Sequence, residues 1–467
     1  MEMLEVRDLK VYFDILKGTV KAVDGVSFNL GAGQTMGLVG ESGCGKTTTA
    51  FAVTSLLPTN GRIVGGEIYF DGKLVGRGDV ADEVATVLKS EKWFEETKAI
   101  VARVNHEHEN HKAQPPESSE LVTLIEDEEP ILQTLNDILS KPENQAESEE
   151  LKKKLEKAVG KLTKGGSGLR HKKRRQRLID RQARTIRWWQ VSMIFQSAMN
   201  AFNPVYRVGK QITEALMVHK DRFRLYHCEN CNEDVKEGKE VNTPNGAICA
   251  RCKSPLVHRT LTKREARKKT LALFDLVGID RSRVDGFPHE FSGGMRQRSM
   301  IAMALACGPK LLIADEPTTA LDVIMQDRVL AEIRDLQKTL GIAMIIITHD
   351  ISVVAEVSEK IGIMYAGKLF EWGNIIDIFD KPANPYTLGL MNAFPSIKGH
   401  KQRLKSIPGS PPDLKNPPPG CSFHPRCPFV QDKCRAERPP TVLVAPDHWS
   451  YCHFAGEVYA GKLREAT

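Results

Sequence analysis

The chain has 467 residues, a formal net charge of +7 and 27% charged residues, so it is large enough to bury more than one hydrophobic core. No stretch approaches about 18 uninterrupted apolar residues, the length that a membrane-spanning helix needs. The first residues also lack the basic-then-apolar pattern of a signal peptide. We therefore expect a cytosolic chain, unless a partner holds it at a membrane.

A glycine-rich motif follows an apolar segment, residues 36–39, that has the composition of a buried strand. Backbone NH groups can surround a polyphosphate only where no side chain blocks the approach, a condition that glycine meets. Lys46 is expected to reach the β- and γ-phosphates, and the Thr47 hydroxyl to coordinate Mg²⁺ at the start of a helix. The predicted nucleotide-binding residues of this motif are Gly40, Ser42, Gly43, Cys44, Gly45, Lys46, Thr47 and Thr48.

A charged segment, residues 77–187, comes next, and apolar residues recur in it at helical spacing. They are Leu132, Leu135, Ile138 and Leu139 after Pro130, and Leu151, Leu155 and Val159 after Ser148. Two helices that pair as a hairpin are the expectation. Residues 117–150 are acidic and residues 171–187 are basic, which favours a solvated surface, with anionic lipid headgroups or nucleic acid as alternative contacts.

Two Cys-x-x-Cys pairs flank 17 residues further along the chain. Their spacing is typical of a zinc ribbon, in which four thiolates surround Zn²⁺ tetrahedrally and leave no ligand position for substrate. A redox dithiol would need only one pair, and a reducing cytosol disfavours disulfides. The predicted structural zinc ligands are Cys228, Cys231, Cys249 and Cys252.

Two carboxylates, Asp315 and Glu316, end a second apolar segment, residues 311–314. Ligands of open α/β sheets bind at the carboxyl ends of parallel strands, so this pair is placed to act on the nucleotide. Asp315 is expected to hold Mg²⁺ through water. Glu316 is expected to polarise the water that attacks the γ-phosphate.

The last 70 residues begin with a proline-rich stretch and then carry four cysteines. These are Cys421, Cys427, Cys434 and Cys452. Their spacing alone indicates a metal site without identifying the metal. Cys44 and Cys307 lie outside both cysteine sets, and simple packing accounts for them.

Residues 291–298 resemble the signature motif of ATP-binding-cassette (ABC) proteins, with Phe291 and Met295 in place of the commonest residues. In that family the serine and glycines begin a helix that closes on the γ-phosphate of ATP held by the opposite subunit. A helix start favours anions, which suits this role. The resemblance thus implies nucleotide contacts by Ser292, Gly293 and Gly294.

Four further residues match this family in order and spacing. Gln196 matches the glutamine that contacts Mg²⁺ and water, and Asp322 belongs to a match of the D-loop. His349, which ends an apolar segment, matches the switch histidine that contacts the γ-phosphate. Phe13, beside Tyr12, falls where the family stacks an aromatic ring on adenine, and core packing is the alternative for it.

Residues 420–428, together with Cys452, resemble the C-terminal region of oligopeptide and dipeptide transporter ATPases. In that family the four tail cysteines are implicated in holding an iron–sulfur cluster. The resemblance therefore implies a 4Fe-4S cluster, with zinc or no metal as the alternatives.

The resemblance implies an α/β fold, a RecA-like P-loop ATPase core of the ABC type with an α-helical subdomain and a cysteine-containing C-terminal extension. The charge pattern and the cysteine spacing add a charged helical insertion and a zinc-ribbon insertion, which the resemblance does not cover. The expected order is core 1–76, helical insertion 77–187, Q-loop and signature subdomain 188–300 with the ribbon at 226–256, core 301–397 and extension 398–467.

The function implied by the resemblance is the ATPase subunit of an importer of oligopeptides or dipeptides, with oligosaccharides as a second class of cargo. Such a subunit works at the cytoplasmic face of the membrane with two permease subunits, a solute-binding protein and a second ATPase that completes a heterodimer, and no nucleic acid is expected. The alternative is a chromosome-maintenance or DNA-repair ATPase. The zinc hook of those proteins supplies one Cys-x-x-Cys per chain, whereas this chain has two such pairs together.

Overall fold

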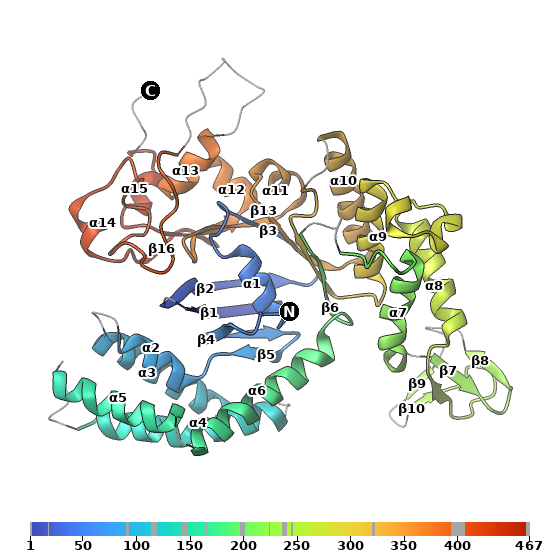
Figure 1. Ribbon diagram of the computed structural model, residues 1–467, viewed down its shortest axis with the longest axis horizontal. Coiled ribbons are helices and arrows are strands. Elements are labelled where there is room, and N and C mark those ends of the chain that lie inside the picture. The colour runs from blue at the N-terminus through green and yellow to red at the C-terminus, as the bar shows by residue number, and fades with distance from the viewer. Residues whose placement is uncertain are drawn as a thin grey trace, which may run out of the picture. The chain divides into compact units, whose positions relative to one another are not determined.

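The computed structural model describes residues 2–16, 18–89, 93–113, 119–141, 148–164, 166–196, 201–223, 225–235, 241–243, 246–319, 323–393 and 407–463 (Figure 1). The chain divides into two compact units. The first combines residues 1–187 with 343–467, and the second comprises residues 188–342. None of the described helices is long and apolar enough to cross a bilayer.

The first unit contains an antiparallel sheet with the strand order β2-β1-β4-β5. Its strands are β1 (Glu2–Ile15), β2 (Gly18–Gly31), β4 (Gly61–Phe70) and β5 (Lys73–Arg77). Asp71 and Gly72 connect the last two strands and both have positive φ, 50° and 71°. This is the conformation of a two-residue type I′ hairpin, which explains why an Asp-Gly pair stands here.

A second sheet of the first unit carries the phosphate loop. Strand β3 (Thr35–Val39) is buried along its whole length and pairs in parallel with β13 (Ala343–Thr348) and β14 (Lys360–Tyr365). A Cβ atom on Gly37 would lie 2.0 Å from Val354 Cγ1, so only glycine lets helix α11 (Ile351–Val357) pack this closely on β3. The continuous apolar composition of these strands is the pattern of a sheet covered on both faces.

Antiparallel strands from the C-terminal part of the chain extend this second sheet. Strand β15 (Lys368–Asn374) pairs with β14, β17 (His448–Tyr451) pairs with β15, and β16 (Thr441–Ala445) pairs with β17. The helices of these regions are α1 (Lys46–Val53), α12 (Ile375–Asp380), α13 (Pro385–Asn392), α14 (Asp432–Ala436) and α15 (Ala455–Tyr459). The extension is therefore part of the core sheet.

The described residues of the predicted insertion form five helices, α2 (Val80–Val87), α3 (Trp93–Ala113), α4 (Ser119–Leu139), α5 (Glu149–Lys164) and α6 (Gly166–Ile186). Helices α4 and α5 contact each other, which confirms the expected pairing, and they share a buried cluster with α2 and α3. The helix around Pro130 begins earlier than the apolar spacing indicated, because Pro130 lies inside α4. In Figure 1 these helices lie beside the antiparallel sheet, where α2 contacts β4 and α6 contacts β5.

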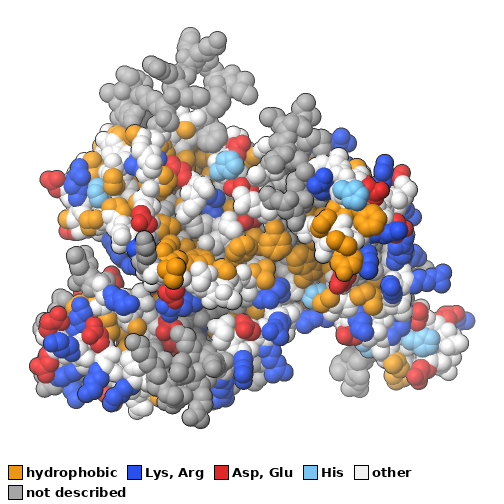
Figure 2. Space-filling view, in the orientation of Figure 1, with side chains coloured by type: hydrophobic (Ala, Val, Ile, Leu, Met, Phe, Trp, Pro, Cys, Tyr) orange, Lys and Arg blue, Asp and Glu red, His pale blue; other side chains and the backbone are white. Residues whose placement is uncertain are grey.

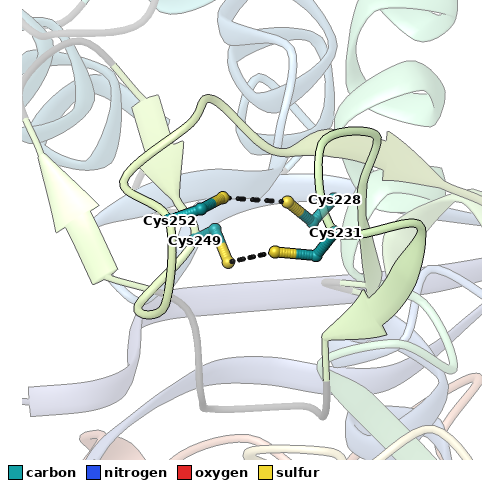
Figure 3. Close-up of side chains that lie close together, drawn as sticks. All are labelled: Cys228, Cys231, Cys249 and Cys252. Carbon is teal, nitrogen blue, oxygen red and sulfur yellow. Dashed lines mark hydrogen bonds between the residues drawn. The ribbon is translucent and has the colours of Figure 1, made fainter.

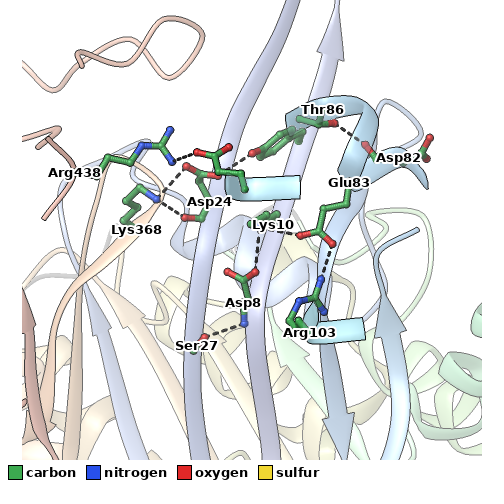
Figure 4. Close-up of polar contacts among 12 residues, drawn as sticks. Asp8, Lys10, Asp24, Ser27, Asp82, Glu83, Thr86, Arg103, Lys368 and Arg438 are labelled. Atoms are coloured by element: carbon green, nitrogen blue, oxygen red, sulfur yellow. Dashed lines mark hydrogen bonds and ion pairs between the residues drawn. The ribbon is translucent and has the colours of Figure 1, made fainter. Parts of the chain in front are cut away.

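Ion pairs attach the insertion to the sheet (Figure 4). Glu83 on α2 accepts hydrogen bonds from Lys10 on β1, at 2.9 Å, and from Arg103 on α3, at 2.7 Å. Lys10 also contacts Asp8 at 3.0 Å. Because the Glu83 side chain is only 3% exposed, these cations compensate a buried charge. In Figure 2 the described surface over the insertion carries blue and red side chains side by side, as expected for a solvated face.

The second unit contains a short parallel pair of strands and a group of helices. Strand β6 (Val191–Ile194) pairs in parallel with β12 (Leu311–Asp315). The helices are α7 (Val208–Val218), α8 (Lys263–Leu276), α9 (Gly293–Leu305) and α10 (Val323–Leu340), with 3₁₀ turns η3 (Lys220–Arg222), η4 (Arg281–Asp285) and η5 (Pro288–Glu290). Helices α7, α8 and α9 pack on one another, as the predicted helical subdomain requires.

The ribbon lies within this second unit and consists of very short strands. They are β7 (Leu225–Cys228), β8 (Glu233–Val235) and β11 (Val257–Arg259) in the order β11-β7-β8, and the hairpin β9 (Val241–Thr243) with β10 (Gly246–Ile248). Strands this short bury little apolar surface, so such a module depends on a covalent or metal crosslink.

Candidate nucleotide-binding and metal sites

The backbone of the phosphate loop requires glycine at three of its predicted positions. Gly45 caps α1 in a left-handed conformation with φ 107°, and a Cβ there would lie 2.3 Å from the Ala22 carbonyl oxygen. A Cβ on Gly40 would lie 2.1 Å from the Met364 carbonyl oxygen. Gly43 has φ 80° and open space around it, so its requirement is conformational.

Lys46 is enclosed by this loop. Its side chain is buried, and Nζ donates to the carbonyl oxygens of Gly40, at 2.7 Å, and Glu41, at 3.0 Å. Thr47 and Thr48 follow it half-buried in the first turn of α1, while Ser42 and Gly43 are exposed. The ammonium group is thus held at the N-terminus of a helix, the place where a polyphosphate binds.

His349 and the phosphate loop share one edge of the second sheet. Thr348 on β13 is paired with Val39 on β3, so His349 and Gly40 directly follow a matched pair of residues. His349 is exposed although every residue of β13 is buried. This edge carries the carboxyl ends of both parallel strands.

The two aromatic residues of the predicted adenine contact differ in exposure. Tyr12 is 4% exposed, and its hydroxyl donates to Asp24 at 2.8 Å. Phe13 is half-buried. Of the pair, Phe13 is therefore the more accessible, and its contact with adenine stays a prediction.

In the second unit, Gln196 and Glu316 are in contact. Gln196 Nε2 donates to Glu316 Oε2 at 2.6 Å, and Thr319 Oγ1 donates to the same oxygen at 3.0 Å. Glu316 has φ 46°, an uncommon conformation for a residue with a side chain, and Asp315 before it is 1% exposed. The parallel pairing of β6 and β12 brings these predicted residues together, although they lie far apart in the sequence.

The signature serine begins helix α9. Ser292 is its N-cap, and Oγ accepts a hydrogen bond from the Met295 NH at 3.3 Å. Gly293 and Gly294 are half-buried in the first turn. Gln297, which the sequence did not single out, donates to the Pro317 carbonyl oxygen and joins this helix to the loop that follows Glu316. The predicted D-loop residue Asp322 lies outside the described residues.

The four ribbon cysteines meet at one point (Figure 3). Their sulfur atoms all lie within 4.8 Å of one another, with 3.4 Å between Cys228 and Cys252 and 4.0 Å between Cys231 and Cys249. Hydrogen bonds from Ser254 lower the pKa of the Cys252 thiol to about 5. Within the described ranges, this is the only group of three or more potential metal ligands that is so close.

The four tail cysteines line one cavity in the first unit, together with Phe370, Phe423 and Tyr451. A hydrogen bond of 2.8 Å from the Cys421 NH to the Cys434 carbonyl oxygen joins two of the segments that carry them. Burial raises the pKa of Cys421 to about 11 and the pKa values of Cys427 and Cys452 to about 12. Metal binding would have to displace these protons.

Comparison with protein families gives two matches. A family model described as "ABC transporter" matches residues 23–166 and 157–319. A second model, "Oligopeptide/dipeptide transporter, C-terminal region", matches residues 370–434. The chain is therefore an ATP-binding protein of the ABC class, and the predicted cassette ATPase core is confirmed.

Curated relatives match along nearly the whole chain. "Oligopeptide transport ATP-binding protein OppD" of Salmonella typhimurium is 33% identical over 96% of this chain and 93% of its own length. "Dipeptide transport ATP-binding protein DppD" of Bacillus subtilis is 32% identical over 97% of this chain and 94% of its own length. The chain belongs to the family of oligopeptide and dipeptide transport ATP-binding proteins, which are ATPases. Nothing in these comparisons supports the DNA-repair alternative.

Proposed function

We propose that this chain hydrolyses ATP to power the import of oligopeptides or dipeptides, at the cytoplasmic face of a membrane. The observation that carries the proposal is that one chain combines a glycine-dependent phosphate loop around Lys46 with a matched peptide-transporter C-terminal region. The relatives carry names of oligopeptide and dipeptide transport, which supports peptides over oligosaccharides as cargo. Two permease subunits, a solute-binding protein and a second, related ATPase are the proposed partners.

In the proposed mechanism, Lys46 and Thr47 bind the β- and γ-phosphates at the start of α1. Mg²⁺, when bound through Thr47, Asp315 and Gln196, would neutralise charge that develops on the phosphates. Glu316 would accept the proton of the water that attacks the γ-phosphate, leaving ADP and phosphate. Its hydrogen bonds with Gln196 and Thr319 support this role, because they fix the carboxylate.

The remaining predicted residues are assigned to nucleotide recognition. Phe13 would stack on adenine, and the exposed His349 would contact the γ-phosphate. Ser292, Gly293 and Gly294 would bind the nucleotide held by the second ATPase subunit, at the positive end of helix α9. Asp322 is proposed for the contact between the two ATPase subunits.

We propose that the ribbon binds one structural Zn²⁺. A tetrahedral ion with Zn–S bonds of about 2.3 Å holds its sulfur atoms roughly 3.8 Å apart. The separations of 3.4 and 4.0 Å in the ribbon agree with that geometry. All four ligands are thiols, so the ion would have no open position for catalysis.

We propose a 4Fe-4S cluster for the tail cysteines, with zinc as the second candidate. All four line one cavity with apolar walls, yet within the described ranges they do not form a group as close as the ribbon cysteines. A cluster of several iron atoms suits such a wider arrangement of thiolates. Metal analysis of the full chain tests both proposals, with about one zinc and about four iron atoms per chain expected.

The substitution Glu316→Gln tests the ATPase mechanism. It removes the proposed proton acceptor but keeps the size of the side chain, so ATP binding should persist while turnover falls at least about 100-fold. Glu457→Gln, at an exposed position of α15, is the matched control and should leave turnover unchanged. Undiminished turnover in Glu316→Gln would remove Glu316 from its assigned role.

A further inference from the structure

The C-terminal extension makes a direct ion pair with the phosphate loop. Arg426 Nη1 lies 2.7 Å from Glu41 Oε2, and Nη2 lies 3.0 Å from Glu41 Oε1. The two terminal nitrogens of the guanidinium group thus each contact one carboxylate oxygen, the strongest geometry for this pair. The Arg426 side chain is 7% exposed and that of Glu41 is 24% exposed, so solvent screens the contact only weakly.

Glu41 is restrained through every polar group that it has. Its NH donates to the Tyr386 hydroxyl at 3.2 Å, and its carbonyl oxygen accepts from Lys46 Nζ at 3.0 Å. The Cys44 NH, at 3.3 Å, donates to the same carbonyl. With Arg426 on its carboxylate, Glu41 is the residue through which the extension, helix α13 and the phosphate-binding lysine meet.

Arg426 is itself held in one orientation. Nε donates to the Pro408 carbonyl oxygen at 2.7 Å, and Nη1 donates to the Tyr365 hydroxyl at 3.2 Å. Phe423, three residues earlier, packs against the rings of Tyr365 and Tyr386 with centroid distances of 5.2 and 5.3 Å. A guanidinium group fixed in this way loses little conformational entropy when it binds a carboxylate.

The pKa of Arg426 also indicates that its contact with Glu41 is part of the folded structure. Burial alone would lower the pKa of Arg426, but its hydrogen bonds with Glu41 and Tyr365 raise it above the ordinary value. Removing Glu41 would therefore leave a buried cation without its carboxylate, which is costly. The pair is part of the folded structure of the loop and not an incidental surface contact.

We propose that Arg426 is a positioning residue of the nucleotide site, which holds Glu41 so that the phosphate loop keeps the shape that ATP binds. The proposal deepens the ATPase function and rests on it. Arg426 directly precedes Cys427, so the same turn of the extension carries a thiol of the tail cavity and the contact with the loop. ATP affinity would then depend on a segment remote in sequence from the loop.

The experiment measures Mg-ATP affinity of the full chain by titration calorimetry. Arg426→Ala and Glu41→Gln should each weaken binding about tenfold, because either change frees the loop from the extension. The double variant should be no weaker than the single variants, since both remove one interaction. Arg426→Lys keeps the charge but loses the two-point contact, so it should recover only part of the affinity.

A second readout separates positioning from a purely structural role. In the variants, KM for ATP should rise about tenfold while kcat at saturating ATP changes by less than about twofold, because the chemical groups remain. Arg435→Ala is the matched control. Arg435 is an exposed arginine of the same extension that directly follows Cys434, and its loss should change neither value.

Three outcomes would overturn the proposal. They are ATP affinities of Arg426→Ala and Glu41→Gln within about twofold of wild type, multiplicative effects in the double variant, and a kcat that falls as much as affinity. Glu41 lies outside the extension. If Arg426→Ala loses metal or folds poorly, the ATP affinity of Glu41→Gln therefore tests whether the ion pair positions the phosphate loop. A wild-type chain that binds no ATP would instead contradict the proposed function.

Discussion

The two four-cysteine segments of this protein, the ribbon (225–259) and the extension (407–463), differ in how they are attached to the rest of their unit. The ribbon has its own three-stranded sheet, and its four thiols lie within 4.8 Å of one another. The extension instead adds β17 to the edge of β15 and buries Phe423 in the core cluster beside the phosphate loop. One cysteine set therefore belongs to a local module, whereas the other belongs to a segment that is packed into the core of its unit.

This difference has a consequence for function. Loss of the ribbon metal should unfold a local module, because the strands of that module bury little surface. Loss of packing in the extension should reach Glu41 through Arg426 and Tyr386, because both residues contact the phosphate loop.

The largest effect is expected in the ribbon itself. The double substitution Cys231→Ser and Cys252→Ser removes two of the four thiols, and zinc content should fall from about one atom per chain to almost none. A structural zinc contributes on the order of 10 kcal/mol to the folding of a small module, so amide hydrogen exchange in the ribbon should accelerate strongly. ATP affinity should stay within about twofold of wild type.

Cys307→Ser is the control for this prediction, since it replaces a cysteine outside both sets and should retain the zinc. The contrast between the two segments would fail if ribbon variants lost zinc and ATP binding together.

A core substitution in the extension should have a global effect. Phe423 is 3% exposed, so Phe423→Ala should reduce the free energy of unfolding by about 3–5 kcal/mol and also weaken ATP binding. Urea unfolding and ATP titration measure the two effects. Leu443→Ala, at a side chain that is 68% exposed on β16 of the same extension, should change the unfolding free energy by less than about 0.5 kcal/mol. Equal effects of the two substitutions would contradict the role of the extension as core.

An ion pair beside the extension should make stability depend on pH. Burial alone would raise the pKa of Asp24, but Lys368 and the Tyr12 hydroxyl lower it below its ordinary value. Figure 4 shows the contact of Lys368 with this carboxylate, at 3.0 Å. Asp24→Asn should cost about 2–3 kcal/mol at pH 7.

The sign of this pH dependence follows from the lowered pKa. Asp24 stabilises the folded state fully above the ordinary carboxyl pKa, about 3.9, and loses that contribution as pH falls further. Urea titrations at several pH values should show a constant gap between wild type and Asp24→Asn above about pH 5 and a shrinking gap below about pH 4. Asp380→Asn, at an exposed site, is the control. A gap that grows on acidification would contradict this assignment.

The smallest effect is expected at the junction of the ribbon with helix α8. Hydrogen bonds from Arg259 lower the pKa of Glu265 to about 2, and Glu265 also completes the capping box with Thr262. Its side chain is 35% exposed, so solvent screening should limit the cost of Glu265→Gln to about 1 kcal/mol or less at neutral pH.

That contribution should be present above the ordinary glutamate pKa, about 4.3, and decrease as pH falls toward 2. Thermal unfolding over this range measures it, with Lys263→Gln, in the same first turn, as the comparison. If Glu265→Gln reduced the free energy of unfolding as much as Asp24→Asn, the result would contradict the expectation that the more exposed carboxylate contributes less.

Sequence reasoning identified the functional residues that lie close to one another along the chain in a recognisable motif. The glycines around Lys46 and the two Cys-x-x-Cys pairs of the ribbon are local patterns, and the structure gives both the expected local geometry. The insertion was only partly predictable. Its apolar spacing indicated two helices, whereas the buried cluster around Leu135 and Leu155 joins four of the described helices, α2 to α5.

Contacts between distant segments could not be read from local sequence patterns, although the family resemblance had assigned Gln196 and Glu316 to one site. Gln196 and Glu316 meet because β6 and β12 pair in parallel, and Gln297 reaches Pro317 from the N-terminal part of α9. The pairing of Arg426 with Glu41 likewise joins residues 385 positions apart.

The phosphate loop, the carboxylates after the second apolar segment, the two cysteine pairs of the ribbon and the family were predictable from the sequence, because each is a pattern of residue types at fixed short spacing. Only the tertiary structure decided that the C-terminal extension belongs to the nucleotide-binding half and that Arg426 reaches Glu41. The physical reason is that an arginine is compatible with solvent as well as with a buried carboxylate. Strand pairing and aromatic packing between distant segments select between these two environments.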